Sequence, residues 1–148
     1  MCCFTRHVFF FPVAAENAYE ALRALKILQL RTGGVREIVT DRASYFASPS
    51  LFQEEAARLL NAHVELTSSR SPWELGSEKL HDIAADRLRV FLRHSSGRWP
   101  DDAYREQELL EEVMLILNTR PLGTYYVSEK GADVITPDSL YFGYTRRR

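Results

Sequence analysis

Two short segments contain the carboxylates whose spacing could support metal chemistry. The first is Thr40-Asp41-Arg42-Ala43-Ser44-Tyr45-Phe46, and the second is Ser71-Pro72-Trp73-Glu74-Leu75-Gly76-Ser77-Glu78. If folding brings Asp41 and Glu78 together, their oxygens suit Mg²⁺, a hard cation that takes oxygen ligands. A pair of such ions can clamp the attacking and leaving oxygens of a phosphodiester. A simpler interpretation stays open, in which Asp41 caps a turn and Glu78 stabilises the first turn of a helix.

Alternating strands and helices must position these carboxylates. The apolar patterns predict strands at 4–12, 37–40 and 63–67, and helices at 16–32, 50–61, 77–95 and 101–118. A capping Thr136 and Pro137 predict one further turn of helix at 136–140, and the remainder reads as loop. This order is typical of an α/β domain with parallel pairings. In such a domain Asp41, at the end of a buried strand, lies at the carboxyl edge of the sheet, where ligand sites form.

Apolar stripes indicate which faces of the two long helices point inward. In the 77–95 helix the stripe consists of Leu80, Ile83, Ala84, Leu88 and Phe91. In the 101–118 helix it consists of Leu109, Leu110, Val113, Ile116 and Leu117. The segment 4–12 is rich in aromatic residues, and we expect it to form a strand that is buried on both faces.

Length and composition predict one globular domain, because 148 residues with 45% hydrophobic and 26% charged side chains are ordinary values. A net charge of -1 excludes a protein held on nucleic acid by bulk charge alone, although it leaves room for a local basic patch. The adjacent Cys2 and Cys3 cannot cross-link distant segments, and the four histidines are scattered, so we expect no structural zinc site. No apolar run approaches the length of a membrane span, and we expect a nuclear or cytoplasmic protein that is not secreted.

Five segments, in collinear order over nearly the whole chain, resemble the catalytic core of retroelement integrases. The likeness is to the long-terminal-repeat retrotransposon type, gypsy-like or BEL/Pao-like. The five segments are Cys3–Val8, Ile38–Phe46, Ser71–Trp73 with Gly76 and Glu78, Asn118–Leu122 and Ile135–Gly143.

The resemblance implies a ribonuclease-H-like mixed sheet flanked by helices, lacking the first strand, over residues 1–144, followed by a basic tail at 145–148. It implies Mg²⁺- or Mn²⁺-dependent polynucleotidyl transfer for DNA integration, with Asp41 and Glu78 as catalytic metal ligands, although a fragment that lacks the first catalytic aspartate could fail to bind these ions. It implies DNA as the partner, no small-molecule substrate and no membrane, and a homodimer formed through the helices at 16–32 and 101–118. The side chains expected near the DNA are Arg42, Arg70 and Lys79, although Lys79 could equally be a solvated residue of a helix face.

Three departures from the family pattern lead us to expect little or no activity from this chain alone. The family's first catalytic aspartate lies on a strand before the segment at 4–12, and no acidic residue precedes Glu16. One residue, Ser77, separates Gly76 from Glu78, where relatives usually have two, so either the start of the helix adjusts or the glutamate is misaimed by about 100°. Ala43 stands where relatives commonly have glycine or asparagine.

Two alternatives remain open at this stage. The chain could be a non-catalytic nucleic-acid- or protein-binding module derived from an integrase. A longer reading frame could also restore the missing aspartate and an active enzyme, so whether the protein is an enzyme is left undecided.

Overall fold

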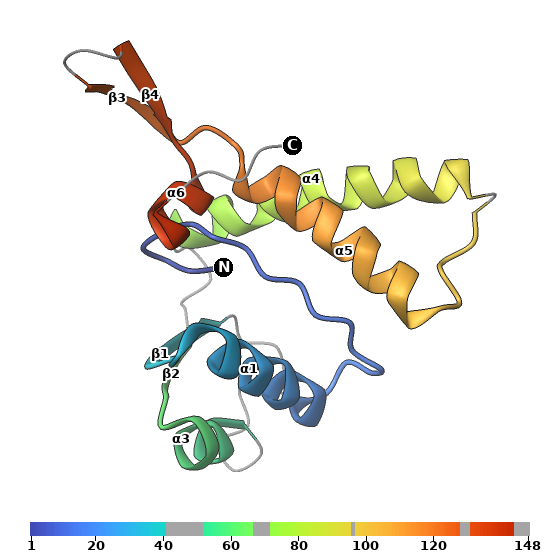
Figure 1. Ribbon diagram of the computed structural model, residues 1–148. Coiled ribbons are helices and arrows are strands. Elements are labelled where there is room, and N and C mark those ends of the chain that lie inside the picture. Colours follow the sequence, from blue (N-terminus) through green and yellow to red (C-terminus); the bar gives the residue numbers. More distant parts are fainter. Residues whose placement is uncertain (41–51, 67–71, 96, 128–130, 144–148) are drawn as a thin grey trace. The chain divides into compact units, whose positions relative to one another are not determined.

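The computed structural model describes residues 1–40, 52–66, 72–95, 97–127 and 131–143, with only the backbone described for residues 72–78 and 127 (Figure 1). The chain divides into two compact units. One consists of Met1–Phe10 with Leu75–Arg148, and the other of Phe11–Glu74. We describe each unit by itself.

The unit of residues 11–74 contains helix α1 (Ala18–Thr32), strand β1 (Glu37–Thr40), helix α3 (Glu54–Leu60) and strand β2 (His63–Leu66). The two strands are parallel, with Glu37 opposite His63 and Thr40 opposite Leu66. This confirms the predicted parallel pairing. The core of the unit is formed by buried Leu22, Phe52 and Ala56, against which Ile38 and Val64 from the two strands pack.

The ends of α1 show why the sequence predicts this helix well. The Asn17 side chain accepts a hydrogen bond from the Glu20 backbone N–H at 3.0 Å, which satisfies a donor that has no partner within the helix. Gly33 ends the helix at a φ of 80°, a left-handed conformation that glycine adopts without steric cost.

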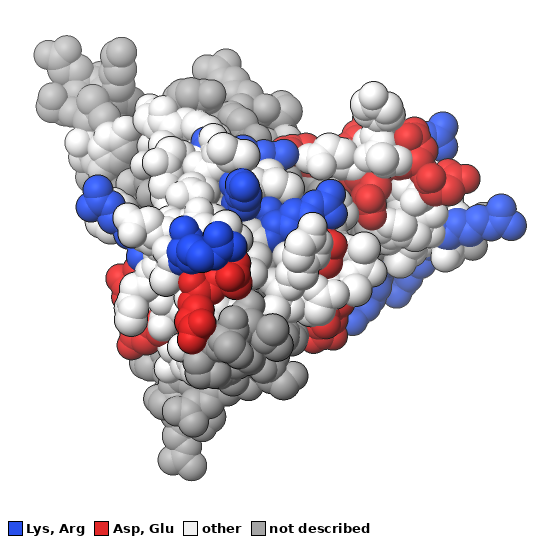
Figure 2. Space-filling view, turned by 90° about the horizontal axis from the view of Figure 1, so that it is seen from below, with Lys and Arg blue, Asp and Glu red and all other residues white. Residues whose placement is uncertain are grey.

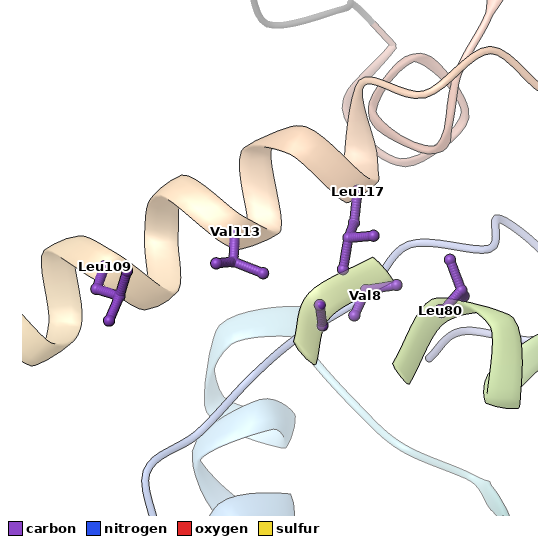
Figure 3. Packing of buried hydrophobic residues seen from close by; sticks show 6 residues of the cluster. Val8, Leu80, Leu109, Val113 and Leu117 are labelled. Carbon is purple, nitrogen blue, oxygen red and sulfur yellow. The ribbon is translucent and has the colours of Figure 1, made fainter. Parts of the chain in front are cut away.

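The other unit contains most of helix α4 (Pro72–His94), helix α5 (Ala103–Asn118), strands β3 (Gly123–Val127) and β4 (Gly131–Ile135), and helix α6 (Pro137–Phe142). Its core is formed by Val8, Leu80, Ala84, Leu109, Val113 and Leu117. Figure 3 shows Leu109, Val113 and Leu117 along one side of α5, with Val8 and Leu80 gathered near the Leu117 end. Ile83, which was predicted to point inward, is 42% exposed.

The N-terminal segment differs from the prediction, because residues 4–12 do not form a strand. Phe4 is 88% exposed, and among residues 4–12 only Thr5, His7 and Val8 are buried. Aromatic and β-branched residues suit a strand, but a strand also needs a partner for its backbone groups. Here side chains of α5 supply two of these partners: the Asn118 amide bonds Val8, and the Met114 sulfur accepts from the Phe10 N–H at 3.2 Å.

Helix α4 begins at Pro72, although residues 68–73 were predicted to be a loop and the helix was predicted to start at Ser77. Gly76 lies inside this helix, where a single glycine costs only about 1 kcal/mol. Proline suits the first turn, because the N–H that it lacks would have no partner within the helix. Glu78 therefore lies in the second turn of α4, and its misaiming stays a prediction, because only the backbone is described at this position.

The hairpin of β3 and β4 occupies a region that was predicted to be loop. The strands are antiparallel, with Gly123 opposite Ile135 and Val127 opposite Gly131. The run Thr124-Tyr125-Tyr126 has high strand propensity, and Gly131 opens β4 at a φ of 85°.

The ribonuclease-H-like sheet stays a prediction, since the described residues form two separate two-stranded sheets. Within the same residues, no helix is both long and apolar enough to cross a membrane.

Candidate functional site

The first predicted carboxylate, Asp41, lies outside the described residues, as do Arg42 and Arg70. The element that leads to Asp41 is nevertheless clear. Thr40 is the last residue of β1, and it is opposite Leu66, the last residue of β2. The carboxyl ends of two parallel strands therefore meet directly before Asp41 in the chain, which is the kind of sheet edge where ligands bind in α/β folds.

The second predicted carboxylate, Glu78, belongs to α4, for which only the backbone is described at this position. Its neighbour Lys79 has an exposed side chain, which suits both a phosphate contact and a solvated helix face. Asp41 and Glu78 belong to different units, and their convergence stays a prediction. Among the residues that the structure describes, no three His, Cys, Asp or Glu side chains gather as a metal site would require.

A polar contact that the sequence did not predict fastens the N-terminal segment to α5. The Asn118 side chain is fully buried at the end of that helix. Its Oδ1 accepts from the Val8 N–H at 2.7 Å, and its Nδ2 donates to the Val8 carbonyl at 2.9 Å. The amide thus satisfies both backbone groups of one residue, as the edge of a neighbouring strand would.

Arg120 makes a second connection between the same two segments. Its Nη2 donates to the Arg6 carbonyl at 3.1 Å, and its Nη1 donates to the Leu117 carbonyl at the end of α5. Burial of the guanidinium, followed by the nearby positive charge of Arg6, lowers the pKa of Arg120. Arg6 itself has a φ of 60°, so the backbone turns sharply immediately before the buried residues.

A third connection joins His7 to α6. His7 Nε2 lies 3.1 Å from Asp138 Oδ1, and the exposed fractions of the two residues are 3% and 0%. The imidazole also packs against Tyr141 and Phe142, with ring centroids 4.5 Å and 5.4 Å away. Burial, and then the charge of nearby Cys2, raises the pKa of the Tyr141 hydroxyl.

The cap of α6 places Asp138 for this contact. The Thr136 hydroxyl accepts from the Ser139 N–H at 3.0 Å, and the Ser139 hydroxyl bonds the Thr136 N–H at 2.8 Å. This reciprocal capping box, followed by Pro137 at the first helical position, confirms the predicted start of the helix.

We call these contacts of Asn118, Arg120 and Asp138 with residues 6–8 the buried clamp. Its residues lie in three of the five segments quoted above, namely 3–8, 118–122 and 135–143. The capping motif at Thr136 could be found from the sequence. The clamp itself could not, because its partners lie 110 to 131 positions apart.

The remaining histidines do not contribute to the clamp. His63, His81 and His94 have exposed side chains on β2 and α4, whereas His7 is the buried one. On the face in Figure 2, Lys and Arg side chains are interspersed with Asp and Glu side chains. This mixture of charges agrees with the net charge of -1. A charged partner would therefore be attracted by a local group of like charges and not by the charge of the whole protein.

Comparison with known proteins finds a similar fold among solved structures. No protein-family model matches the sequence, and no curated protein matches it. A chain of the "CryoEM structure of simian T-cell lymphotropic virus intasome in complex with PP2A regulatory subunit B56 gamma" is similar in fold, with a TM-score of 0.59 and 17% sequence identity. The match covers 90% of this chain and 43% of that chain, so the present chain spans less than half its length. At this identity the likeness concerns the fold alone, and that fold occurs in a viral intasome complex.

Proposed function

We propose that the chain is the catalytic-core portion of an integrase-type polynucleotidyl transferase of the long-terminal-repeat retrotransposon kind, with DNA as its partner. The observation that carries the proposal is the fold similarity to a chain of a viral intasome complex over 90% of the present sequence. The five collinear segments support it independently, because they arise from residue identity rather than from backbone shape.

Asp41 and Glu78 are the proposed ligands of Mg²⁺ or Mn²⁺. The donor chemistry fits these ions, since both side chains are carboxylates and hard divalent cations take oxygen ligands. The place of Asp41 in the chain also supports a ligand role, because Asp41 directly follows Thr40, where β1 ends beside the end of β2. When bound, such ions stabilise charge on the oxygens of a phosphodiester during transfer.

The other proposed roles belong to basic residues of the chain. Arg42, Arg70 and Lys79 contact phosphate groups and hold the DNA in register, as basic side chains do without reading its sequence. Of these, Lys79 has an exposed side chain on α4, one residue after Glu78. Residues 1–15 contain no Asp or Glu, so a third carboxylate of the family type is not supplied by that segment.

Calorimetric titration with Mn²⁺ and Mg²⁺ tests the proposed ligands directly. We expect specific binding to the full chain and its loss in both Asp41→Asn and Glu78→Gln. The matched control is Asp82→Asn, which removes an exposed carboxylate from the same helix and should bind like the unchanged chain. Binding that survives both ligand variants, or that the control also loses, would contradict the assignment.

A second candidate function is binding without catalysis. The observation that favours it is the buried clamp, whose described contacts hold residues 6–8 against α5 and α6. In this case we expect salt-sensitive DNA binding with no nicking in Mg²⁺ or Mn²⁺. Nicking that disappears in Asp41→Asn would exclude this second candidate.

A further inference from the structure

The hairpin of β3 and β4 is exposed to solvent along most of its length. Tyr125 and Tyr126 of β3 are 46% and 88% exposed, and Val134 of β4 is 42% exposed. Thr124 and the residues at 131–133 are exposed as well. Within the part of the chain that the structure describes, no third strand pairs with this hairpin. Because a two-stranded hairpin is only marginally stable in water, the hairpin would gain stability from a further strand.

The register of the two strands gives the hairpin two different faces. Tyr125 lies opposite Asp133, and its hydroxyl donates to Asp133 Oδ2 at 3.2 Å, so one face is polar at its centre. The neighbouring pairs of residues lie on the other face, because successive side chains of a strand point to opposite sides. This second face carries no charged group and consists of Thr124, Tyr126, Ala132 and Val134.

The outer edges of the two strands differ in how readily they accept another strand. Strand β4 contains the charged Asp133, whose Oδ1 accepts from the Val134 N–H at 2.8 Å. A charge on an edge strand hinders pairing with a further chain. Strand β3 has the sequence Gly-Thr-Tyr-Tyr-Val, which contains no charged residue and no proline, and its Tyr and Thr residues have high strand propensity. The edge of β3 is therefore the one suited to accept a strand.

We propose that β3 pairs with β3 of a second copy of this chain, in antiparallel orientation, and so joins two hairpins into one four-stranded sheet. A two-fold axis beside Tyr125 places this residue opposite Tyr125 of the second copy, and Thr124 opposite Tyr126 of the second copy. Opposite residues of an antiparallel pair point to the same side, so the uncharged faces of both hairpins form one continuous face.

The charge pattern favours a second copy as the occupant of this edge. A strand without charges can face itself without repulsion, and pairs of Tyr with Tyr and of Tyr with Thr are favourable across strands. Pairing of β4 with itself around Asp133 would place two carboxylates opposite each other, which is destabilising. In the proposed dimer both β4 strands become the outer edges, and their carboxylates hinder further growth, so assembly closes at two copies.

The proposed interface is small, because only five residues of each chain pair through their backbones. It buries less than the roughly 1,200 Å² of a stable interface, so we expect a weak dimer. It is also distinct from the dimer through the helices at 16–32 and 101–118 that the family resemblance implies. Neither the metal ligands nor DNA is needed for it.

The test is sedimentation equilibrium of the full chain, in which we expect a monomer–dimer equilibrium at concentrations up to about 0.5 mM. Tyr125→Lys places two positive charges opposite each other at the two-fold axis and should weaken dimerisation by about tenfold. Within its own hairpin, the introduced lysine still faces Asp133. The matched control is Ala132→Lys, which adds the same charge to β4 and should change dimerisation by less than about threefold.

Two further measurements separate strand pairing from loss of the hairpin. Amide hydrogen exchange at Thr124, Tyr125 and Tyr126 should slow as the concentration of the unchanged chain rises, because pairing protects backbone N–H groups. For Tyr125→Lys, dimerisation should recover in part at about 1 M salt, because salt screens the repulsion between the two lysines. A hairpin that had merely unfolded would not recover in this way.

Four results would overturn the proposal. They are a chain that stays monomeric at about 0.5 mM, a dimer that Tyr125→Lys leaves unchanged, an equal loss in Ala132→Lys, and a dimer whose β3 amides gain no protection. The metal titration of Asp41→Asn decides the integrase-type assignment separately from each of these results.

Discussion

The buried clamp makes a quantitative prediction for Asn118→Asp. The substitution preserves shape, but a carboxylate can only accept hydrogen bonds, so the Val8 carbonyl 2.9 Å away would lose its donor and face a negative charge instead. A protonated carboxyl avoids the conflict, because its O–H can donate to that carbonyl while its other oxygen still accepts from the Val8 N–H. We therefore expect the introduced carboxyl to be protonated in the folded protein.

The loss of folding free energy arises because the introduced carboxyl must stay protonated in the folded protein, whereas it is ionised in the unfolded chain at pH 7. An unfolded aspartate has a pKa of about 3.9, so keeping its proton at pH 7 costs about 1.36 × (7 − 3.9), or about 4 kcal/mol. At pH 4 the same cost is about 0.5 kcal/mol. The variant loses stability as the pH rises, since the pKa of the introduced carboxyl is higher in the folded than in the unfolded protein. The loss of stability is small below pH 4 and grows by about 1.4 kcal/mol for each pH unit above it, up to the folded pKa.

Urea unfolding at pH 4, 5.5 and 7 measures the difference between the variant and the unchanged chain. Amide hydrogen exchange at Val8 reports whether the loss is located at the clamp. The control is Asn17→Asp at the cap of α1, where aspartate caps as well as asparagine and its charge favours the helix N-terminus. That variant should be neutral or slightly stabilising at pH 7. An equal loss for Asn118→Asp at pH 4 and pH 7, or no loss at all, would refute the two-bond account of the clamp.

Three further substitutions test the packing around the clamp by the same unfolding measurement. Leu117→Ala, at a side chain that is 1% exposed, should cost about 2–5 kcal/mol, whereas Leu30→Ala, at 78% exposed, should cost less than about 0.5 kcal/mol; similar values would contradict the assigned core. Thr136→Ala removes the cap of α6 and should cost about 1 kcal/mol, and a neutral result would argue against the capping box. His7→Leu keeps the apolar packing but removes a partner of the buried Asp138, so a loss of about 3 kcal/mol in the free energy of unfolding is expected. Replacing Asp138 by asparagine in the same variant should recover part of this loss, and no recovery would argue against the His7–Asp138 contact as its cause.

The sequence predicted those elements whose ends carry local chemical signals. Helix α6 starts at Thr136 and Pro137, as its capping residues predicted. Helix α1 was predicted from its apolar spacing and from the glycines that follow it; its end at Thr32 is confirmed, whereas it starts at Ala18 and not at residue 16. The start of α4 was misplaced: the helix was predicted from Ser77, but it begins at Pro72 and includes Gly76, a small cost in a helix of 23 residues.

Predictions failed where a distant partner decides the structure. The segment 4–12 has the composition of a strand, yet its backbone is bonded by side chains more than 100 positions away. The candidate metal ligands could be predicted from residue type, and they remain predictions, because Asp41 and the side chain of Glu78 lie outside the described residues. The residues Asn118 and Asp138 lie in segments that resemble the integrase core, but their contacts could not be predicted, because residue type does not show which distant group each side chain meets.

The division of the chain also fixes the order in which its parts can fold during synthesis. The unit of residues 11–74 is continuous, so it can form soon after it leaves the ribosome. The other unit is interrupted: residues 6–8 emerge first, but their partners Asn118, Arg120 and Asp138 emerge more than a hundred residues later. At a synthesis rate of about 5–20 residues per second, the apolar N-terminal segment stays without its partners in α5 and α6 for roughly 5–25 s. During that interval it is a natural target for chaperones, and any slowing of translation before residue 138 would prolong its exposure.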